Sequence, residues 1–193
     1  LHLCDRRQRQ MCIRDRWYRI CSKILGYSEC NLIQVPIYMQ FKLVLNDTFD
    51  KYNCGEFDKK ENDTISVSKS NFSHETDEVN VMISDTYPLS LSQLPEIKKN
   101  IPTLLISRNN TNDVNRYDSP ELVRCVVNEV RSLNNNIKKV NVYATTNPLN
   151  TKNIASSAFK LGGRDNFNEV RVFQQERDGI RKFNNKGIVV YKR

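Results

Sequence analysis

The segment KVNVYATTNPLNTKNIASSAFKLGG (residues 139–163) carries the strongest structural signal in the chain. Its first six residues alternate Val140, Val142 and Ala144 with Asn141 and Tyr143, which is the period of a β-strand. Further on, apolar residues recur at helical spacing, and a glycine pair is typical of a helix end. These residues are Ile154, Ala155, Ala158, Phe159 and Leu161, with Gly162 as the expected terminator. The segment therefore predicts a strand followed at once by a helix.

The segments around this stretch extend the pattern. Residues 102–107 (PTLLIS) form a short apolar run that predicts a strand. Ser119-Pro120-Glu121 combines an N-cap residue, a proline at the first helical position and an acidic first turn, and an apolar stripe follows it. Two closing strands are expected at residues 169–174 and 187–192. The C-terminal half therefore has the order β-α-β-α-β-β, which predicts an α/β (α+β) fold with a single mixed sheet flanked by helices.

The N-terminal half is less regular. Residues 17–26 (WYRICSKILG) have apolar side chains at helical spacing and end in a glycine, so they predict a helix. Residues 35–45 alternate apolar and mixed side chains and predict a strand. Two β-branched runs, residues 64–69 and 79–84, are expected to pair as a hairpin. We therefore expect residues 17–193 to form a single α/β domain.

The first sixteen residues, LHLCDRRQRQMCIRDR, differ from the rest of the chain. They contain five arginines and no apolar periodicity, and they contribute +3 of the formal net charge of +8. The run MCIRDR looks like a sequencing adapter translated in frame, so residues 1–16 are expected to be a non-native leader outside the fold. The alternative is a natural basic arm that binds phosphate backbones.

The order of elements over residues 103–193 resembles the C-terminal half of the GCN5-related N-acetyltransferase (GNAT) superfamily. The asparagines at the helix start, Asn147, Asn150 and Asn153, and the helix ending FKLGG are similar to a late signature of that family. The resemblance implies an acetyltransferase-like sheet whose two central strands splay apart around Ser107 and Tyr143. It also implies acetyl-CoA as the cofactor and direct acetyl transfer to an amine of a small molecule or peptide.

The resemblance implies four cofactor-binding residues. Arg116 and the backbone around Ser119 would hold the pyrophosphate, and Asn150 and Asn153 would meet the pantetheine arm. The segment RYDSPE that begins at Arg116 lacks the two glycines of the family's phosphate loop, and Ala158 stands where many members have a tyrosine acid. No catalytic residue is therefore assigned, and the sequence leaves open whether the chain is an enzyme.

A second hypothesis is a non-catalytic α/β module, either a degenerate acetyltransferase or a viral protein, that binds a protein partner or nucleic acid. Residues 17–193 carry 25 basic and 20 acidic side chains, a net charge of +5 that suits either an anionic ligand or an ordinary solvated surface. The cysteines and histidines lack zinc-ligand spacing, so no metal is expected. No apolar run approaches the roughly eighteen residues of a membrane span. We therefore expect a soluble, cytoplasmic chain without a membrane partner.

Overall fold

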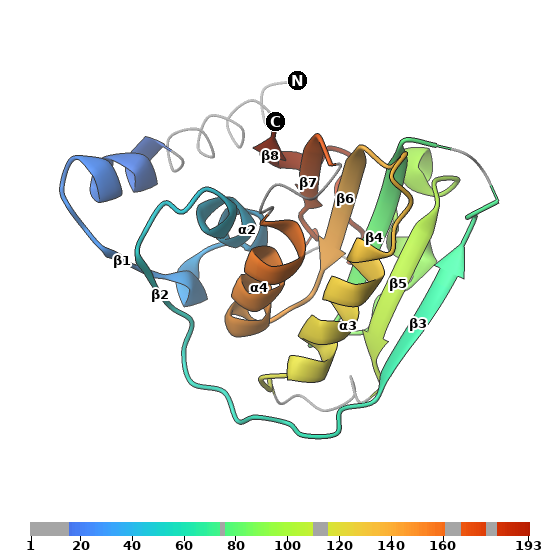
Figure 1. Ribbon diagram of the computed structural model, residues 1–193, viewed down its shortest axis with the longest axis horizontal. Coiled ribbons are helices and arrows are strands. Elements are labelled where there is room, and N and C mark those ends of the chain that lie inside the picture. Colours follow the sequence, from blue (N-terminus) through green and yellow to red (C-terminus); the bar gives the residue numbers. More distant parts are fainter. Residues whose placement is uncertain (1–15, 74–75, 110–115, 161–166, 177–180) are drawn as a thin grey trace.

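A six-stranded mixed sheet forms the centre of the computed structural model, which describes residues 16–73, 76–109, 116–160, 167–176 and 181–193. The strand order is β3-β5-β4-β6-β7-β8 (Figure 1). The strands are β3 (Ile65–Ser70), β4 (Glu78–Ser84), β5 (Thr103–Arg108), β6 (Lys139–Ala144), β7 (Glu169–Phe173) and β8 (Ile188–Lys192). The four inner strands run parallel, and β3 and β8 pair antiparallel at the two edges. The predicted α/β (α+β) class with one mixed sheet flanked by helices is confirmed.

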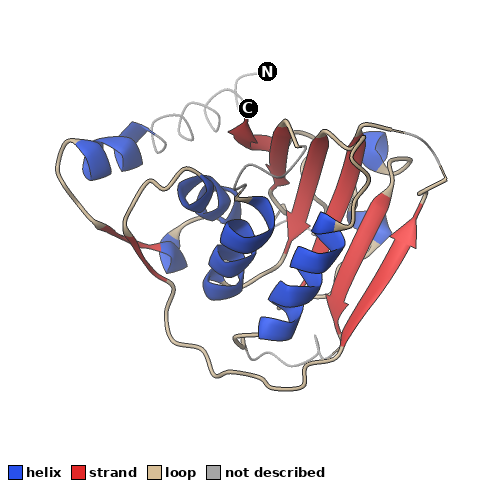
Figure 2. Ribbon diagram, in the orientation of Figure 1, coloured by secondary structure: helices blue, strands red, loops and turns tan. Residues whose placement is uncertain are grey.

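Three helices cover one face of this sheet (Figure 2). They are α2 (Ile37–Leu45), α3 (Pro120–Arg131) and α4 (Pro148–Ile154), and α4 continues into a π-helical turn, η4 (Ala155–Phe159). The main hydrophobic core lies between these helices and the sheet, with Val81, Ile83 and Val142 among its fully buried strand residues. This burial is the main stabilising contribution of the layer.

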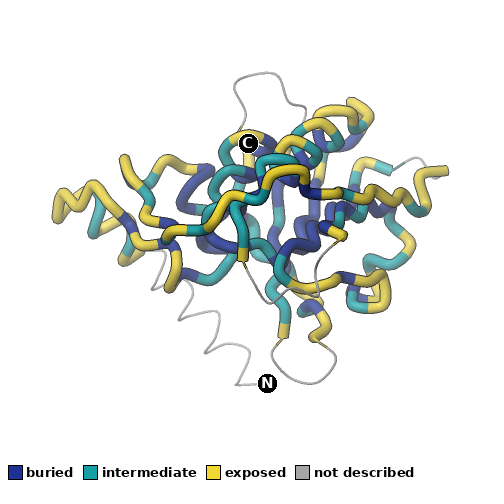
Figure 3. The backbone as a smooth tube through the Cα atoms, turned by 90° about the horizontal axis from the view of Figure 1, so that it is seen from below, coloured by how far each residue is buried: buried dark blue, intermediate teal, exposed yellow. Residues whose placement is uncertain are grey.

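The opposite face of the sheet has a smaller core of its own. Two 3-10 turns, η2 (Leu91–Gln93) and η3 (Glu96–Lys98), lie in the connection between β4 and β5. The buried residues of this second core are Met82, Leu89, Leu94, Tyr143, Phe173 and Phe183. Successive strand residues point to opposite faces of a sheet, so Val142 of β6 joins the first core and Tyr143 the second. Both faces of β6 are therefore buried. Figure 3 shows the buried centre and the exposed periphery of the chain.

The N-terminal part of the chain lies beside the helical layer. Residues 16–23 are helical, as the sequence predicts for 17–26, and Gly26 follows with a φ of 69°. A two-stranded parallel sheet comes next, formed by β1 (Glu29–Asn31) and β2 (Lys51–Asn53), and the 3-10 turn η1 (Leu32–Gln34) follows β1.

Two predictions for the N-terminal half are wrong. Residues 35–45 were expected to be a strand, but residues 37–45 form helix α2. Nearly every side chain of this helix is buried, so the apolar run carries no clear helical period in the sequence. The expected hairpin of β3 and β4 does not form. Instead β5 lies between them and pairs with both, so tertiary pairing overrides sequence proximity.

The predicted elements of the C-terminal half are confirmed. The side chain of Ser119 caps α3 by accepting a hydrogen bond from the backbone N–H of Leu122, and Pro120 is the first helical residue. Strands β7 and β8 pair antiparallel, as two closing strands should. The helix after β6 is present, but its last turn is π-helical, and the expected terminator Gly162 lies outside the described residues.

Candidate ligand-binding edge of the sheet

The sheet contains a topological switch point at β4. The chain passes from β4 to β5 on one side and then crosses to β6 on the other, and both neighbours pair with β4 in parallel. In open α/β sheets, ligands bind outside the carboxyl ends of the strands at such a point. The residues that follow β4, β5 and β6 at this carboxyl edge are therefore the first place to look for a site.

A buried ion network lies at the carboxyl edge. Nε of Arg108 is 2.9 Å from Oδ2 of Asp63, and Nη1 of Arg108 is 2.8 Å from Oδ1 of Asp85. The Arg108 side chain is 1% exposed and both aspartate side chains are 0% exposed. One guanidinium thus faces two carboxylates. Burial raises the pKa of Asp85 above its ordinary value, although hydrogen bonds from Asn150 and Asn147 and the charge of Arg108 act in the opposite direction.

Two asparagines connect this ion network to the loops of the carboxyl edge. Nδ2 of Asn150 donates to Oδ2 of Asp85 at 2.9 Å and to the Tyr117 carbonyl at 3.0 Å. The Asn147 side chain donates to the same carbonyl at 2.7 Å. The Ser119 hydroxyl donates to Oδ2 of Asp63 at 2.7 Å, and its backbone N–H donates to Oδ1 of Asn150 at 3.2 Å. The network therefore holds the segments after β4, β5 and β6 in one arrangement.

Two aromatic–cation pairs, here called the rim pairs, lie at the carboxyl edge, and Cζ of Arg108 is also 5.4 Å from the ring centroid of Tyr117. Nζ of Lys60 is 5.0 Å from the ring centroid of Tyr117, and Cζ of Arg181 is 4.5 Å from that of Tyr87. The two carbonyls of these tyrosines accept hydrogen bonds from residues that follow β6: Tyr117 from Asn147 and Tyr87 from the Thr145 hydroxyl at 2.8 Å. The backbone of each rim tyrosine is therefore hydrogen-bonded to a residue that follows β6. Aromatic faces can stack on nucleobases, and Lys and Arg pair with phosphates.

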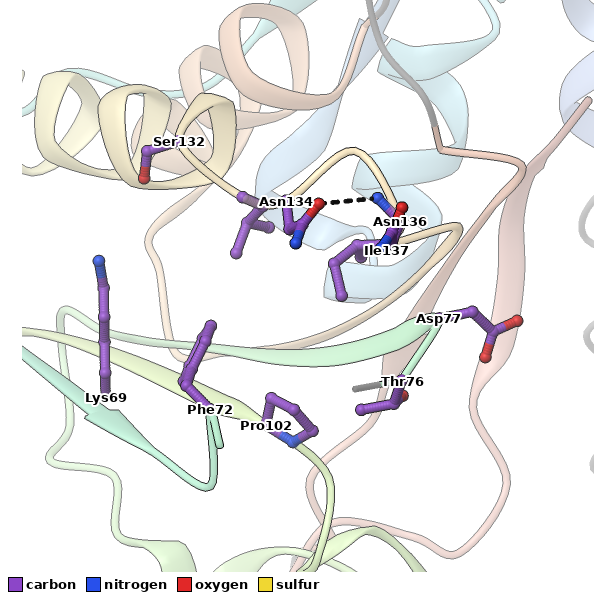
Figure 4. Close-up of a pocket in the computed structure, with 10 residues that line it drawn as sticks. Lys69, Phe72, Thr76, Asp77, Pro102, Ser132, Asn134, Asn136 and Ile137 are labelled. Atoms are coloured by element: carbon purple, nitrogen blue, oxygen red, sulfur yellow. Dashed lines mark hydrogen bonds between the residues drawn. The ribbon is translucent and has the colours of Figure 1, made fainter. Parts of the chain in front are cut away.

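One pocket lies at the other end of the sheet. It has a volume of about 510 Å³ and is lined by residues near the amino ends of the parallel strands, such as Asp77 before β4 and Pro102 before β5 (Figure 4). Its lining mixes one cation, Lys69, with one carboxylate, Asp77, and several apolar groups. Because these charges cancel and this end is opposite to the switch point, the pocket is a weaker candidate for an anionic ligand than the carboxyl edge.

A second pocket, of about 400 Å³, lies between α3 and β3. Its lining includes Asp63, Glu121 and Glu129 against a single cation, Arg124, so its charge disfavours anions. Within the described ranges, no group of three or more His, Cys, Asp or Glu side chains is arranged to hold a metal ion.

The structure brings together two of the four cofactor-binding residues predicted from the sequence. Ser119 and Asn150 are fully buried and hydrogen-bonded to each other, so they help to hold the loops at the carboxyl edge in place. Arg116 is exposed beside Tyr117, whereas Asn153 lies further along α4, where its carbonyl accepts from the Ser156 hydroxyl. A ligand-binding role for any of the four stays a prediction.

Sequence reasoning missed the ion network itself. Asp85 directly follows β4 and Arg108 is the last residue of β5, so both positions could have been found from strand ends alone. The sequence did not indicate that β4 and β5 are parallel neighbours, and this pairing is what places Asp85 and Arg108 together. Asp63 gives no such signal, because it precedes the antiparallel strand β3 within a long irregular connection.

The chain matches one family model over nearly its whole length. Residues 7–190 match the SMODS- and ubiquitin system-associated 2TM effector domain (SUa-2TM). No curated protein matches the chain. Among the described residues, no helix is long and apolar enough to cross a membrane.

Solved structures of one receptor are among those with a similar fold. The Acinetobacter baumannii Cap4 SAVED/CARF-domain containing receptor with the cyclic trinucleotide 2'3'3'-cAAA superimposes with a TM-score of 0.57 at 11% identity, covering 81% of this chain and 36% of the receptor. The same receptor with 3'3'3'-cAAA gives a TM-score of 0.55 at 11% identity, covering 81% of this chain and 37% of the receptor. The chain therefore spans about a third of the length of these receptors.

These findings correct the GNAT interpretation. The family match and the shared receptor fold replace the acetyltransferase family, and acetyl-CoA and an amine substrate lose their support with it. The sheet also lacks the implied splayed pair: β4 lies between Ser107 and Tyr143 and pairs with both strands, with Ser84 opposite Ser107 and Met82 opposite Tyr143. The predicted leader at residues 1–16 and the cytoplasmic location stay predictions.

Proposed function

The chain belongs to the family of SMODS- and ubiquitin system-associated 2TM effector domains, and we propose that it binds a cyclic oligonucleotide at the carboxyl edge of its sheet. The proposal agrees with the non-catalytic binding module considered from the sequence. It is supported by the receptor fold, because the receptors that share it were solved with cyclic trinucleotides. Since the chain spans about a third of those receptors, ligand binding by this chain alone is part of the proposal.

The observation that carries the proposal is the pair of tyrosine–cation contacts beside the switch point. A cyclic oligonucleotide presents nucleobase faces around a ring of phosphodiester anions. Tyr87 is 45% exposed, with the Arg181 guanidinium over its ring, and Tyr117 lies under the Lys60 ammonium. Each rim pair thus offers one group that suits a base and one that suits a phosphate. The buried network holds the Tyr117 carbonyl through Asn147 and Asn150, and its single cation faces two carboxylates, so it contributes no free positive charge of its own.

Calorimetric titration of the full chain with 3'3'3'-cAAA tests the proposal, with linear triadenylate as the reference ligand. Tyr87→Ala and Tyr117→Ala are each expected to weaken binding by about 5- to 100-fold, because stacking on an aromatic side chain contributes about 1–3 kcal/mol per base. Tyr27→Ala is the matched control, since Tyr27 is an exposed tyrosine remote from the rim pairs.

Two results would contradict the proposal. One is the absence of heat and of thermal stabilisation with either nucleotide at millimolar concentration. The other is binding that both rim variants leave unchanged while their unfolding curves match that of the parent chain. Equal affinity for the linear and cyclic ligands would reject the cyclic form as the preferred one.

A further inference from the structure

The N-terminal helix has three distinct faces. At about 100° per residue, its described side chains and Ile24 fall into three separate sectors. The sector facing the protein consists of Tyr18, Cys21 and Ser22. An outward apolar sector consists of Trp17, Ile20 and Ile24. The sector beside it is basic and consists of Arg16, Arg19 and Lys23.

The inner sector fixes the helix on the protein. The ring of Tyr18 packs edge-to-face on Phe49 with centroids 6.3 Å apart, and the Ser22 hydroxyl donates to the Thr48 carbonyl. Cys21 packs against the main core. The helix therefore has a defined orientation, and its other two sectors point away from the domain.

The outward apolar sector continues past the end of the helix. Gly26, with its φ of 69°, turns the chain, and the backbone N–H of Tyr27 bonds back to the Cys21 carbonyl at 3.0 Å. The exposed residues form what we call the outer patch: Trp17 at 58% exposure, Ile20 at 36%, Ile24 at 75%, Leu25 at 54% and Tyr27 at 60%. Figure 1 shows this helix at the far end of the molecule from β3, and the same end is exposed over most of its length in Figure 3.

We propose that the outer patch docks on an anionic lipid surface. Residues 17–28 contain two exposed basic side chains, Arg19 and Lys23, and no acidic one before Glu29, so the patch has a basic sector beside it. An apolar face that carries Trp and Tyr and lies beside a basic face is typical of helices that lie in the membrane interface.

A lipid surface explains the patch better than a second copy of the chain. A two-fold dimer would bring the same sector of both chains together, so the cations Arg19 and Lys23 of one copy would approach those of the other. Anionic headgroups instead neutralise these charges. The expectation of no membrane partner rested on the lack of a spanning segment, and an interfacial helix needs none.

Trp17 makes the test specific, because it is the only tryptophan in the chain. The full chain is mixed with phosphatidylcholine vesicles that contain either no phosphatidylserine or about 30% of it, a content that gives the surface a negative potential. We expect a blue shift of Trp17 emission and co-sedimentation with the anionic vesicles only. Ile20→Ser combined with Ile24→Ser should lower the partition coefficient at least about tenfold. Ile97→Ser, at a similarly exposed isoleucine on η3 (72%), should leave it unchanged.

A second pair of variants tests whether vesicle binding depends on the cations beside the outer patch. Arg19→Gln with Lys23→Gln should weaken binding to anionic vesicles about tenfold or more, because each surface cation contributes about fivefold. Lys59→Gln with Lys186→Gln removes the same net charge away from the helix and should have a much smaller effect. Residues 1–15 are present in every variant, so they cannot produce these differences.

Several outcomes would overturn the proposal. The first is an unshifted Trp17 spectrum with anionic vesicles, and the second is an equal shift with neutral ones. A third is vesicle binding that the double isoleucine variant does not weaken. The last is a concentration-dependent dimer that shifts Trp17 emission without lipid, which would identify a second copy as the occupant. Circular dichroism of each variant establishes that the comparison is made between folded chains.

Discussion

Replacing Arg108 by methionine should destabilise this domain more than any surface change. The substitution keeps an unbranched side chain of similar length but removes the cation between Asp63 and Asp85, whose side chains are 0% exposed. Both carboxylates would then be buried without their partner, and breaking a buried ion pair on one side costs about 3–5 kcal/mol. For a domain of this size each kcal/mol lowers the melting temperature by about 2–4 °C, so a decrease of roughly 6–20 °C is expected.

Urea and thermal unfolding followed by circular dichroism measure this effect. Lys59→Met is the control, because Lys59 forms a long, exposed contact with Glu61 at 3.8 Å and such pairs contribute less than about 1 kcal/mol. Adding Asp85→Asn to Arg108→Met removes one of the two uncompensated charges and should recover about 1–3 kcal/mol. A loss below about 1 kcal/mol for Arg108→Met, or no recovery in the double variant, would refute the view that Arg108 balances these carboxylates. If Arg108→Met does not fold, Arg108→Lys is measured instead: it keeps the charge and tests how much of the stability depends on a guanidinium that reaches both carboxylates.

Three further perturbations test other parts of the structure. Burial raises the pKa of Asp85 above its ordinary value of 3.8, so the carboxyl group binds its proton more tightly in the folded state than in the unfolded state. The free energy of unfolding should therefore fall as pH rises from 3.8 through the folded pKa. Asp85→Asn should remove this component, and unchanged pH dependence of the urea midpoints over about pH 4–7 would contradict it. Ser119→Ala loses both the α3 cap and the bond to Asp63, so it should cost about 1–2 kcal/mol in thermal unfolding, with Ser119→Thr retaining most of the stability. Gly187→Ala would bring a Cβ to within 2.5 Å of the Phe173 ring. We expect it to lower the free energy of unfolding by about 1–3 kcal/mol and to alter the near-ultraviolet circular dichroism spectrum. An unchanged stability and spectrum would mean that the ring can move aside at no cost.

Much of the secondary structure could be predicted from local signals. Helix α3 begins at Ser119 because its hydroxyl and Pro120 satisfy the first turn, and that information is contained in three adjacent residues. Helix α2 could not be recognised in the same way. Polar and aromatic side chains such as Gln40 and Tyr38 are buried along with its aliphatic ones, so no exposed face gives the segment a helical period.

Some contacts of the candidate site could likewise be expected from the sequence, and others could not. The contact of Ser119 with Asn150 joins two residues that the sequence had already singled out, because each begins or lies near the start of a helix. The grouping of Arg108 with Asp63 and Asp85 depends on which strands are neighbours. Strands β4 and β3 flank β5 on its two sides, and that arrangement brings one carboxylate from each side to the same guanidinium.

The sequence by itself determined the fold class, most of the helices and strands, and the Ser119 cap of α3, because these depend on periodicity and on hydrogen bonds between residues a few positions apart. Only the tertiary structure decided the strand order, the helical state of residues 37–45, the ion network of Arg108 and the hydrogen bonds that join Thr145 and Asn147 to the rim tyrosines. It also separated the outer patch of the N-terminal helix from the side that packs on the core. The physical reason is that burial and pairing between distant segments set these features, and a local pattern contains no information on which distant segment will supply the partner.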